Sequence, residues 1–322
     1  MEDFYRDDEG VLYDNVKWHT RKKHAFIEFY LKIWVDRVRN SPPTLDIFDL
    51  FASTGLCYCD ERKKCGLPDP TWPGSTILSA ECLEHYPKGR TLFLNTFHPK
   101  EAICHSQKEN LEHLLSKYSK IHPVITTLEI NDALKEACRY VVPNFPSLWI
   151  LDPHAASDLP WNIVETIGNL RGQWTDNGGK ARERQPEMII TLMTYGLQMN
   201  VNIYPNTVST MLGLPEEKWR PKYDALMAKY DNTRKALVEM YAERLSELYD
   251  KPPIIVEINT TNETAIVYVV FLCTDSNAGH YLMKQEGMKE YNSWIHQWKQ
   301  DARTITAGGK LPEGQTKIFD NF

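Results

Sequence analysis

The chain has 322 residues, of which 42% are hydrophobic and 25% are charged. These fractions are ordinary for a globular protein and exclude a disordered tail, a collagen-like chain and a small disulfide scaffold. The net charge of −6 excludes a uniformly basic nucleic-acid binder, although a local basic face on an acidic body stays open.

No targeting or membrane segment is expected. The first nine residues are acidic and contain no apolar run, which argues against a secretory signal. The longest apolar stretch, residues 265–273, has about half the length that a bilayer span requires. The seven cysteines are odd in number and favour reduced thiols. We therefore expect a cytoplasmic protein.

The first predicted element is an amphipathic helix over residues 15–39. Phe26, Tyr30 and Trp34 recur at the spacing of one buried helix face. The consecutive prolines Pro42-Pro43 end the helix. We expect residues 1–44 to form an N-terminal helical segment.

Short apolar runs then alternate with helical stretches, a pattern typical of a mostly parallel sheet with helices on both faces. The helical stretches fall near residues 75–86, 99–119, 131–141 and 160–170. The expected strands are residues 45–51, 91–94, 124–128, 147–151 and 188–192.

The C-terminal third has a different pattern. Residues 215–249 are helical in character, within an insertion at about 205–250. Two β-branched runs, 254–258 and 265–270, are close enough to form an antiparallel hairpin. We expect one α/β domain over 45–299, followed by a polar tail over 300–322.

Two of the predicted strands end in residues that can carry chemistry. In an open α/β sheet, ligands bind beyond the carboxyl ends of the strands. Asp49 and the small residues 52–55 follow the first strand, and Asp152-Pro153-His154 follows the fourth. We expect Asp152 and His154 to face the acceptor substrate of a reaction, and His154 to act there as a general acid or base. The alternative for His154 is a turn cap.

Several short motifs together resemble a known family, the three-Cys-motif partner proteins (TcmP), over roughly residues 15–290. That family is similar to Rossmann-like S-adenosylmethionine (SAM) methyltransferases. It occurs in bacteria and their phages and is named for gene neighbours with a three-Cys radical-SAM-like motif. The motifs are Trp18 and Lys23, Tyr30-Leu31, Asp49-Leu50-Phe51-Ala52, Gly74-Ser75, Leu151-Asp152-Pro153 and Asn277-Ala278-Gly279-His280.

The resemblance implies a Rossmann-like fold and a transferase that modifies nucleic acid, such as a DNA base, in a phage or bacterium. Its SAM pocket would comprise Asp49, Ala52, Ser53, Gly55, Asn95 and Asp132.

The chain departs from the family at two points of this pocket. Ser53-Thr54 stands where the family has Gly-Pro, and Asn95 stands where such enzymes place an acidic residue for the ribose hydroxyls. These departures leave two alternatives open. One is a non-catalytic partner of a radical-SAM-like enzyme, and the other is the transfer of a non-methyl group, such as an amino acid, to a modified base.

Two basic regions are candidates for nucleic-acid or anion contact. Lys23 lies in a cluster of cations at the start of the first helix, where an anion would offset the helix dipole. Arg171, Arg182 and Arg184 lie in the polar insert 171–186, which we expect beside the reactive site as a phosphate clamp. Trp174 in the same insert is expected to stack on a base. The alternative is a solvated loop.

Cys57, Cys59 and Cys65 form a C-x-C-x5-C pattern. Three thiolates bind zinc when a fourth ligand, such as His85 or His98, completes the site. The spacing is not that of common zinc modules, so we expect free cysteines and no metal. The chain also lacks the P-loop, G-x-S-x-G, H-E-x-x-H and G-x-G-x-x-G motifs.

Overall fold

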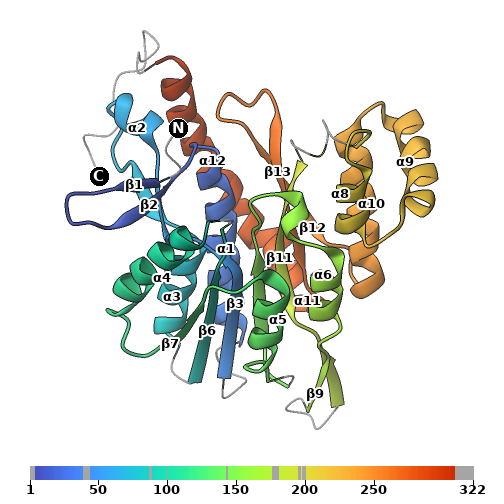
Figure 1. Cartoon of the computed structure of the whole chain (residues 1–322), viewed down its shortest axis with the longest axis horizontal. Helices are drawn as coiled ribbons and strands as arrows, with labels where there is room; N and C mark the ends of the chain where they lie inside the picture. Colours follow the sequence, from blue (N-terminus) through green and yellow to red (C-terminus); the bar gives the residue numbers. More distant parts are fainter. Residues whose placement is uncertain are drawn as a thin grey trace.

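The computed structural model of the protein describes residues 4–38, 44–86, 89–98, 100–142, 144–175, 181–194, 197 and 201–308. Its centre is a seven-stranded sheet in the order β12-β13-β11-β8-β3-β6-β7 (Figure 1). The strands are β3 (Thr44–Ala52), β6 (Gly89–Thr96), β7 (His122–Thr126), β8 (Ser147–Leu151), β11 (Glu187–Met193), β12 (Ile254–Asn259) and β13 (Ile266–Cys273).

The sheet is mostly parallel, as the sequence predicts. β7, β6, β3, β8 and β11 pair in parallel, and β13 is antiparallel to both β11 and β12. With helices on both faces, this is a Rossmann-like architecture. The predicted strands and the C-terminal hairpin are all confirmed.

The helices form two layers, one packed on each face of the sheet through hydrophobic side chains. On one face Leu45 and Ile47 of β3 pack with residues of α1, α3, α4 and α12. On the other face Phe48 and Trp149 stack at 4.2 Å between ring centroids and belong to a cluster with α5, α6, α8, α9 and α10. These helices are α1 (Thr20–Val38), α3 (Ser75–Glu84), α4 (Glu101–Leu115), α5 (Ile130–Cys138), α6 (Trp161–Gly168), α8 (Pro205–Leu212), α9 (Glu216–Tyr230), α10 (Thr233–Leu248) and α12 (Met288–Thr306).

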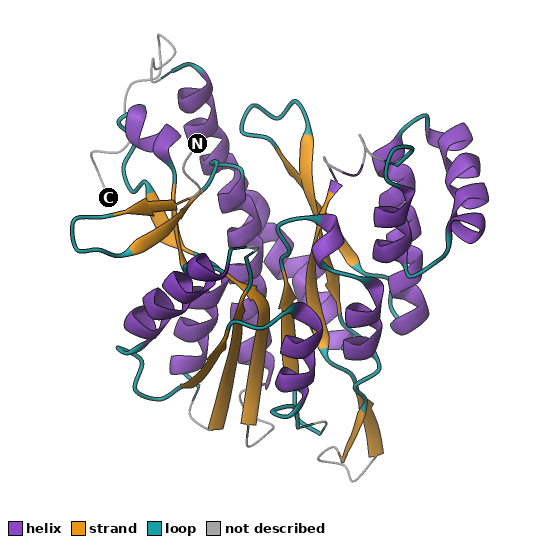
Figure 2. Cartoon of the chain, in the orientation of Figure 1, coloured by secondary structure: helices purple, strands orange, loops and turns teal. Residues whose placement is uncertain are grey.

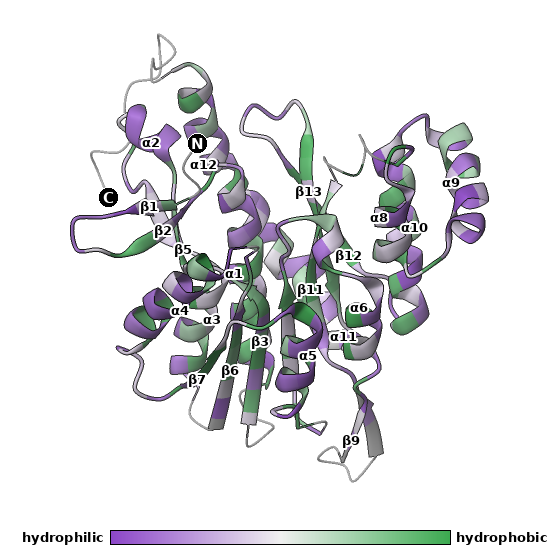
Figure 3. Ribbon diagram, in the orientation of Figure 1, coloured by the Kyte–Doolittle hydropathy of each residue, from purple (hydrophilic) through white to green (hydrophobic). Residues whose placement is uncertain are grey.

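The colouring by hydropathy agrees with this layering, since the central strands carry most of the hydrophobic residues and the outer helices are mixed (Figure 3). The insertion is helical, but α9 and α10 are separate helices. Asp231 adopts a left-handed conformation (φ 48°) between them, and Asn232 caps α10 through its side chain. No helix in the described ranges is both long and apolar enough to cross a bilayer.

The N-terminal segment is not purely helical, which corrects the prediction for residues 1–44. A second, four-stranded sheet in the order β1-β2-β4-β5 joins the N-terminal hairpin to the segment that follows β3 (Figure 2). Its strands have only three or four residues, too few to show a period in the sequence. They are β1 (Phe4–Arg6), β2 (Leu12–Asn15), β4 (Leu56–Tyr58) and β5 (Thr71–Pro73).

The C-terminal end of the chain also differs from the expected polar tail over 300–322. α12 continues to Thr306 and buries Ala302 and Thr304. Trp298 of this helix stacks on Trp18, with 6.2 Å between the ring centroids, so α12 packs against the N-terminal part of the chain. Residues 309–322 lie outside the described ranges.

Candidate functional site

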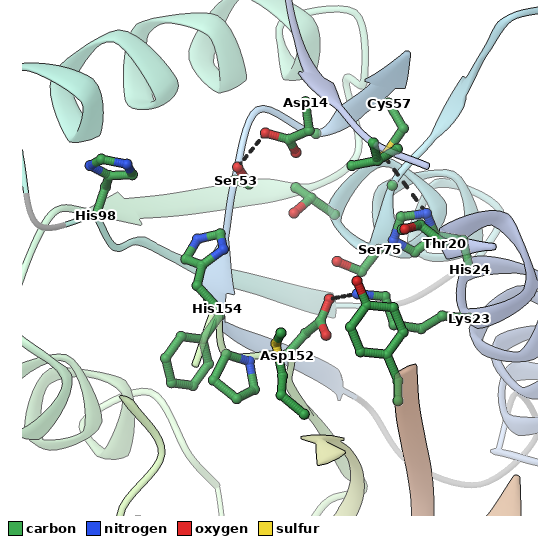
Figure 4. A pocket seen from close by; sticks show the side chains of 18 of the residues that line it. Asp14, Thr20, Lys23, His24, Ser53, Cys57, Ser75, His98, Asp152 and His154 are labelled. Carbon is green, nitrogen blue, oxygen red and sulfur yellow. Dashed lines mark hydrogen bonds and ion pairs between the residues drawn. The ribbon is translucent and has the colours of Figure 1, made fainter. Parts of the chain in front are cut away.

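A cavity of about 560 Å³ lies at the carboxyl ends of β3 and β8. α1, the small sheet and the start of α3 complete its walls (Figure 4). Many residues that the sequence analysis named line this cavity, among them Lys23, Ser53, Gly55, Cys57, Asp152 and His154.

Lys23 and Asp152 form an ion pair across the cavity wall. Their side chains are only 9% and 16% exposed. Burial by itself lowers the pKa of Lys23, but the Asp152 carboxylate outweighs it and raises that pKa. Burial likewise raises the pKa of Asp152, and Lys23 reverses this, so the carboxylate is held ionised. The anion expected beside Lys23 is therefore Asp152 of the chain itself.

Asp49 lies behind the cavity wall and is not one of the lining residues. Its carboxylate accepts hydrogen bonds from the hydroxyls of Ser75 (2.8 Å) and Thr76 (3.2 Å) at the start of α3. It also accepts one from the backbone N–H of Phe51. Burial raises the pKa of Asp49 to about 6. Ala52, at the end of β3, is buried as well, so neither residue is in the position expected for a cofactor contact.

Asn95 is fully buried and its side-chain amide is saturated. Its Nδ2 donates to the carbonyl oxygens of Leu50 and Leu128, and its Oδ1 accepts from Thr126 and from the Leu128 backbone N–H. An amide has two donors and two acceptor sites, so none is left for a ribose. The expected ribose contact is therefore wrong. The Asn95 side chain instead links the ends of β3, β6 and β7 through its hydrogen bonds.

Asp132 is not in the cavity. It lies in the exposed first turn of α5, where it pairs with Lys135 at 2.8 Å. Asp132 therefore forms a surface ion pair and does not contribute to the cavity as the resemblance implied.

His154 lines the cavity with its side chain exposed. Its ring centroid lies 6.5 Å from that of His98, another lining residue. Asp152 and His154 thus face the same space. Their role toward an acceptor stays a prediction.

Asp14 is a lining residue that the sequence analysis missed. β2 carries it into the cavity, where its Oδ1 accepts a hydrogen bond from the Ser53 hydroxyl at 2.6 Å. Gln107 of α4 donates to the same hydroxyl at 2.9 Å. Burial raises the pKa of Asp14. No sequence signal marks Asp14, because it meets Ser53 only through the pairing of β2 with β4.

His24 is the second residue that was missed. It is 5% exposed and lines the cavity one position after Lys23 on α1. The indole N–H of Trp72 donates to its Nδ1 at 2.9 Å, and the Cys57 sulfur lies 3.7 Å from the same atom. Burial lowers the pKa of His24 to about 3, so the ring is neutral and carries its proton on Nε2.

Two cysteines of the C-x-C-x5-C pattern lie in a hydrophobic cluster. Cys57 and Cys59 are buried in a cluster with Trp18 and Trp72, and burial raises the pKa of both thiols. Within the ranges that the structure describes, no group of three or more His, Cys, Asp and Glu side chains is arranged to hold a metal ion. The Cys57 thiol instead faces His24.

The basic insert is at the wrong edge of the sheet for the predicted clamp. α6 carries the chain back from the carboxyl end of β8 to the amino end of β11, and the insert directly precedes β11. It forms a hairpin of β9 (Gly172–Thr175) and β10 (Ala181–Arg184), at the end of the molecule opposite the small sheet (Figure 1).

Within this hairpin, Arg171 pairs with Glu183 and donates to the carbonyl of Leu248. Trp174, Arg182 and Arg184 have their backbone in β9 and β10, and their side chains lie outside what is described. The placement of these residues beside the reactive site is therefore wrong.

Comparison with known proteins supports the fold. No family model and no curated protein matches the chain. Among solved structures, it is similar to protein LPL1258 of Legionella pneumophila str. Philadelphia 1, of family model DUF519, with a TM-score of 0.52 and 11% identity. The match covers 88% of this chain and 93% of that one.

A second solved structure is the O-methyltransferase TomG of Streptomyces achromogenes, in complex with SAM. It matches with a TM-score of 0.38 and 10% identity over 82% of this chain and 92% of that one. At 11% identity, the likeness to LPL1258 concerns the fold alone. The resemblance to the TcmP family stays a prediction.

Proposed function

We propose that this protein is a group transferase that binds a SAM-type cofactor in the cavity and modifies a nitrogen or oxygen of a nucleic-acid base. The observation that carries the proposal is the open cavity at the carboxyl ends of β3 and β8, lined by both Asp152 and His154. This is the edge of a Rossmann-like sheet at which ligands bind.

The cavity fits such a cofactor in size and in the shape of its floor. A volume of about 560 Å³ is within the range of small-molecule sites. Gly55 has a φ of +86°, and the Gly74 N–H donates to its carbonyl at 2.8 Å. A Cβ on Gly74 would lie 3.2 Å from that oxygen, so the two glycines permit a close backbone turn under the ligand.

When bound, SAM supplies an electrophilic methyl group on a sulfonium. The protein supplies the handling of the acceptor. Asp152, which Lys23 keeps ionised, accepts a hydrogen bond from the N–H or O–H of the acceptor and orients it. His154 is exposed to the same space and takes up the proton released by the acceptor.

The second candidate function is a non-catalytic partner of a radical-SAM-like enzyme. The saturation of Asn95 favours it, because this residue cannot hold a ribose. A vestigial site would be filled by side chains, whereas this cavity is open, so we favour the transferase. Transfer of a larger group, such as an amino acid, would use the same acceptor residues.

The choice of nucleic acid as acceptor, and of a phage or bacterial setting, rests on the family resemblance. The basic hairpin of β9 and β10 does not support a nucleic-acid acceptor, because it lies away from the cavity. We therefore choose a test that does not presuppose which kind of nucleic acid is the acceptor.

Incubation of the purified protein with methyl-labelled SAM and, in separate reactions, DNA and RNA provides that test, with nucleoside mass spectrometry as the readout. We expect label in one nucleoside, and a loss of roughly 100-fold or more in rate for His154→Ala and Asp152→Asn. His154 is exposed, so its variant should keep the fold. Asp132→Asn is the matched control away from the cavity. Absence of label in every nucleic acid would overturn the proposal.

A further inference from the structure

The charges that line the cavity do not balance. Asp14, Asp152 and Asp158 are its carboxylates, and Lys23 is the one lysine or arginine among its described lining residues. Lys23 is paired with Asp152, and Asp158 accepts the backbone N–H of Ala155 at 2.9 Å. Asp14 therefore faces the cavity without a cationic partner among the described residues. Its titratable neighbour in the cavity is His154.

The position of Asp14 is fixed from two sides. The Ser53 hydroxyl donates to its Oδ1, and its own backbone N–H donates to the Thr54 hydroxyl at 3.0 Å. Asn110 of α4 also ties β2 to this loop, through hydrogen bonds to Leu12 and to the Thr54 carbonyl. A carboxylate held this firmly in a pocket is prepared to accept a cationic donor.

His24 offers the complementary group. Because Trp72 donates to its Nδ1, the imidazole presents Nε2–H as a donor with a fixed tautomer. The ring turns its Nδ1 toward the Cys57 sulfur, and a Cβ on Gly74, just before α3, would lie 3.8 Å from that sulfur. His24 and Ser75 both line the cavity (Figure 4). The ring is nine-tenths buried, and the described contacts give Nε2 no acceptor. Because His24 lines the cavity, this N–H is available to a ligand there.

We infer that the cavity recognises an α-amino-acid group, with its ammonium at Asp14 and its carboxylate at the Nε2–H of His24 beside the start of α3. The ammonium then binds the Asp14 carboxylate, and the ligand's carboxylate accepts a hydrogen bond from His24. The N-terminal end of a helix also favours a carboxylate. The inference rests on the proposed function for the remainder of the ligand. The same group can belong to the methionine part of SAM or to a free amino acid.

Calorimetric titration of the full chain with three ligands tests this. The ligands are SAM, 5′-methylthioadenosine, which lacks the amino-acid group, and L-methionine. We expect Asp14→Asn to weaken SAM binding roughly 10- to 100-fold and to leave 5′-methylthioadenosine unchanged. Asp158→Asn removes the same charge elsewhere in the cavity and should leave both affinities unchanged. Ser53→Ala, a milder change, should weaken SAM binding a few-fold.

The outcomes separate the inference from the proposed function. Equal SAM affinity in Asp14→Asn, Ser53→Ala and the wild type overturns the inference and leaves the transferase standing. A wild type that binds neither nucleoside overturns the transferase. In that case, L-methionine binding that depends on Asp14 still supports the inference, and its absence overturns the inference too.

Discussion

At the scale of single residues, the pair of Lys23 and Asp152 decides the state of the cavity wall. Removing one partner of a buried pair leaves the other charge uncompensated, which is a large cost. We predict that Lys23→Met lowers the free energy of unfolding by about 3 kcal/mol. The double variant Lys23→Met/Asp152→Asn should recover part of this loss. Urea denaturation of the wild type, Lys23→Met, Asp152→Asn and the double variant measures the coupling, and strictly additive effects would contradict the pairing.

Asp46 provides a second residue-scale prediction, on pH. It is 2% exposed, and burial raises its pKa to about 6, above an unfolded value of about 3.9. The folded state therefore binds this proton more tightly, and the stability that it contributes is present below about pH 4 and lost as the pH rises through 6.

The free energy of unfolding of the wild type should therefore decrease between about pH 4 and about pH 7. We predict that this decrease is smaller by roughly 3 kcal/mol in Asp46→Asn. Asp132→Asn, on the surface, should keep the wild-type profile. If the Asp46→Asn profile also follows the wild type, burial does not raise the pKa of this carboxyl in the folded protein.

At the scale of elements, the turn after β3 depends on Gly55. A Cβ there would lie 2.8 Å from the Leu111 side chain, in addition to the strain of a positive φ. Gly10 has the same φ of +86° but has nothing within 4 Å of its Cβ position. We predict that Gly55→Ala destabilises the protein by at least about 1 kcal/mol more than Gly10→Ala does. Similar melting temperatures for the two variants would refute the tight packing of this turn.

The elements also show what sequence reasoning can reach. The five parallel strands and the C-terminal hairpin are long enough to display an apolar run, so their existence follows from composition and period. Asp152 and His154 were found because they directly follow such a strand. The three- and four-residue strands of the small sheet have no period, so Asp14 could not be placed. His24 was missed because it sits among cations that look like a solvated face.

The error about the basic insert has a topological cause. Each helix of an alternating β/α pattern returns the chain to the opposite edge of the sheet, so a segment between a helix and the next strand lies away from the strand ends that bind ligand. Asn95 was misjudged for another reason. Asn95 does follow the expected strand in the sequence. Only the folded structure shows that its amide donors and acceptors already bind the surrounding backbone.

At the scale of the whole molecule, α12 joins the end of the described chain to its beginning. The indole N–H groups of Trp18 and Trp298 each donate to the other residue's carbonyl, at 3.4 and 3.2 Å. Trp18 leads into α1, which carries Lys23 and His24. We predict that Trp298→Ala costs about 3–5 kcal/mol and weakens ligand binding. Tyr281→Ala, at a side chain that is 65% exposed, is the control. Equal melting temperatures would show that this contact contributes nothing.

The position of the hairpin gives a further molecular prediction. Because β9 and β10 lie at the edge opposite the cavity, Arg182→Ala/Arg184→Ala should leave the affinity for SAM unchanged. Calorimetry of this double variant checks it. A clear loss of affinity would place the hairpin near the ligand and contradict the topology described above.

The central claim is that a SAM-type ligand occupies the cavity at the carboxyl ends of β3 and β8. Ultraviolet cross-linking of methyl-labelled SAM to the full chain, followed by peptide mapping, tests it most directly, with excess unlabelled SAM as the competitor. We predict competable label on peptides that carry Asp14 to His24, Ser53 to Cys57 or Asp152 to Asp158. Label confined to the helical insertion, or no label that the competitor removes, would contradict the claim.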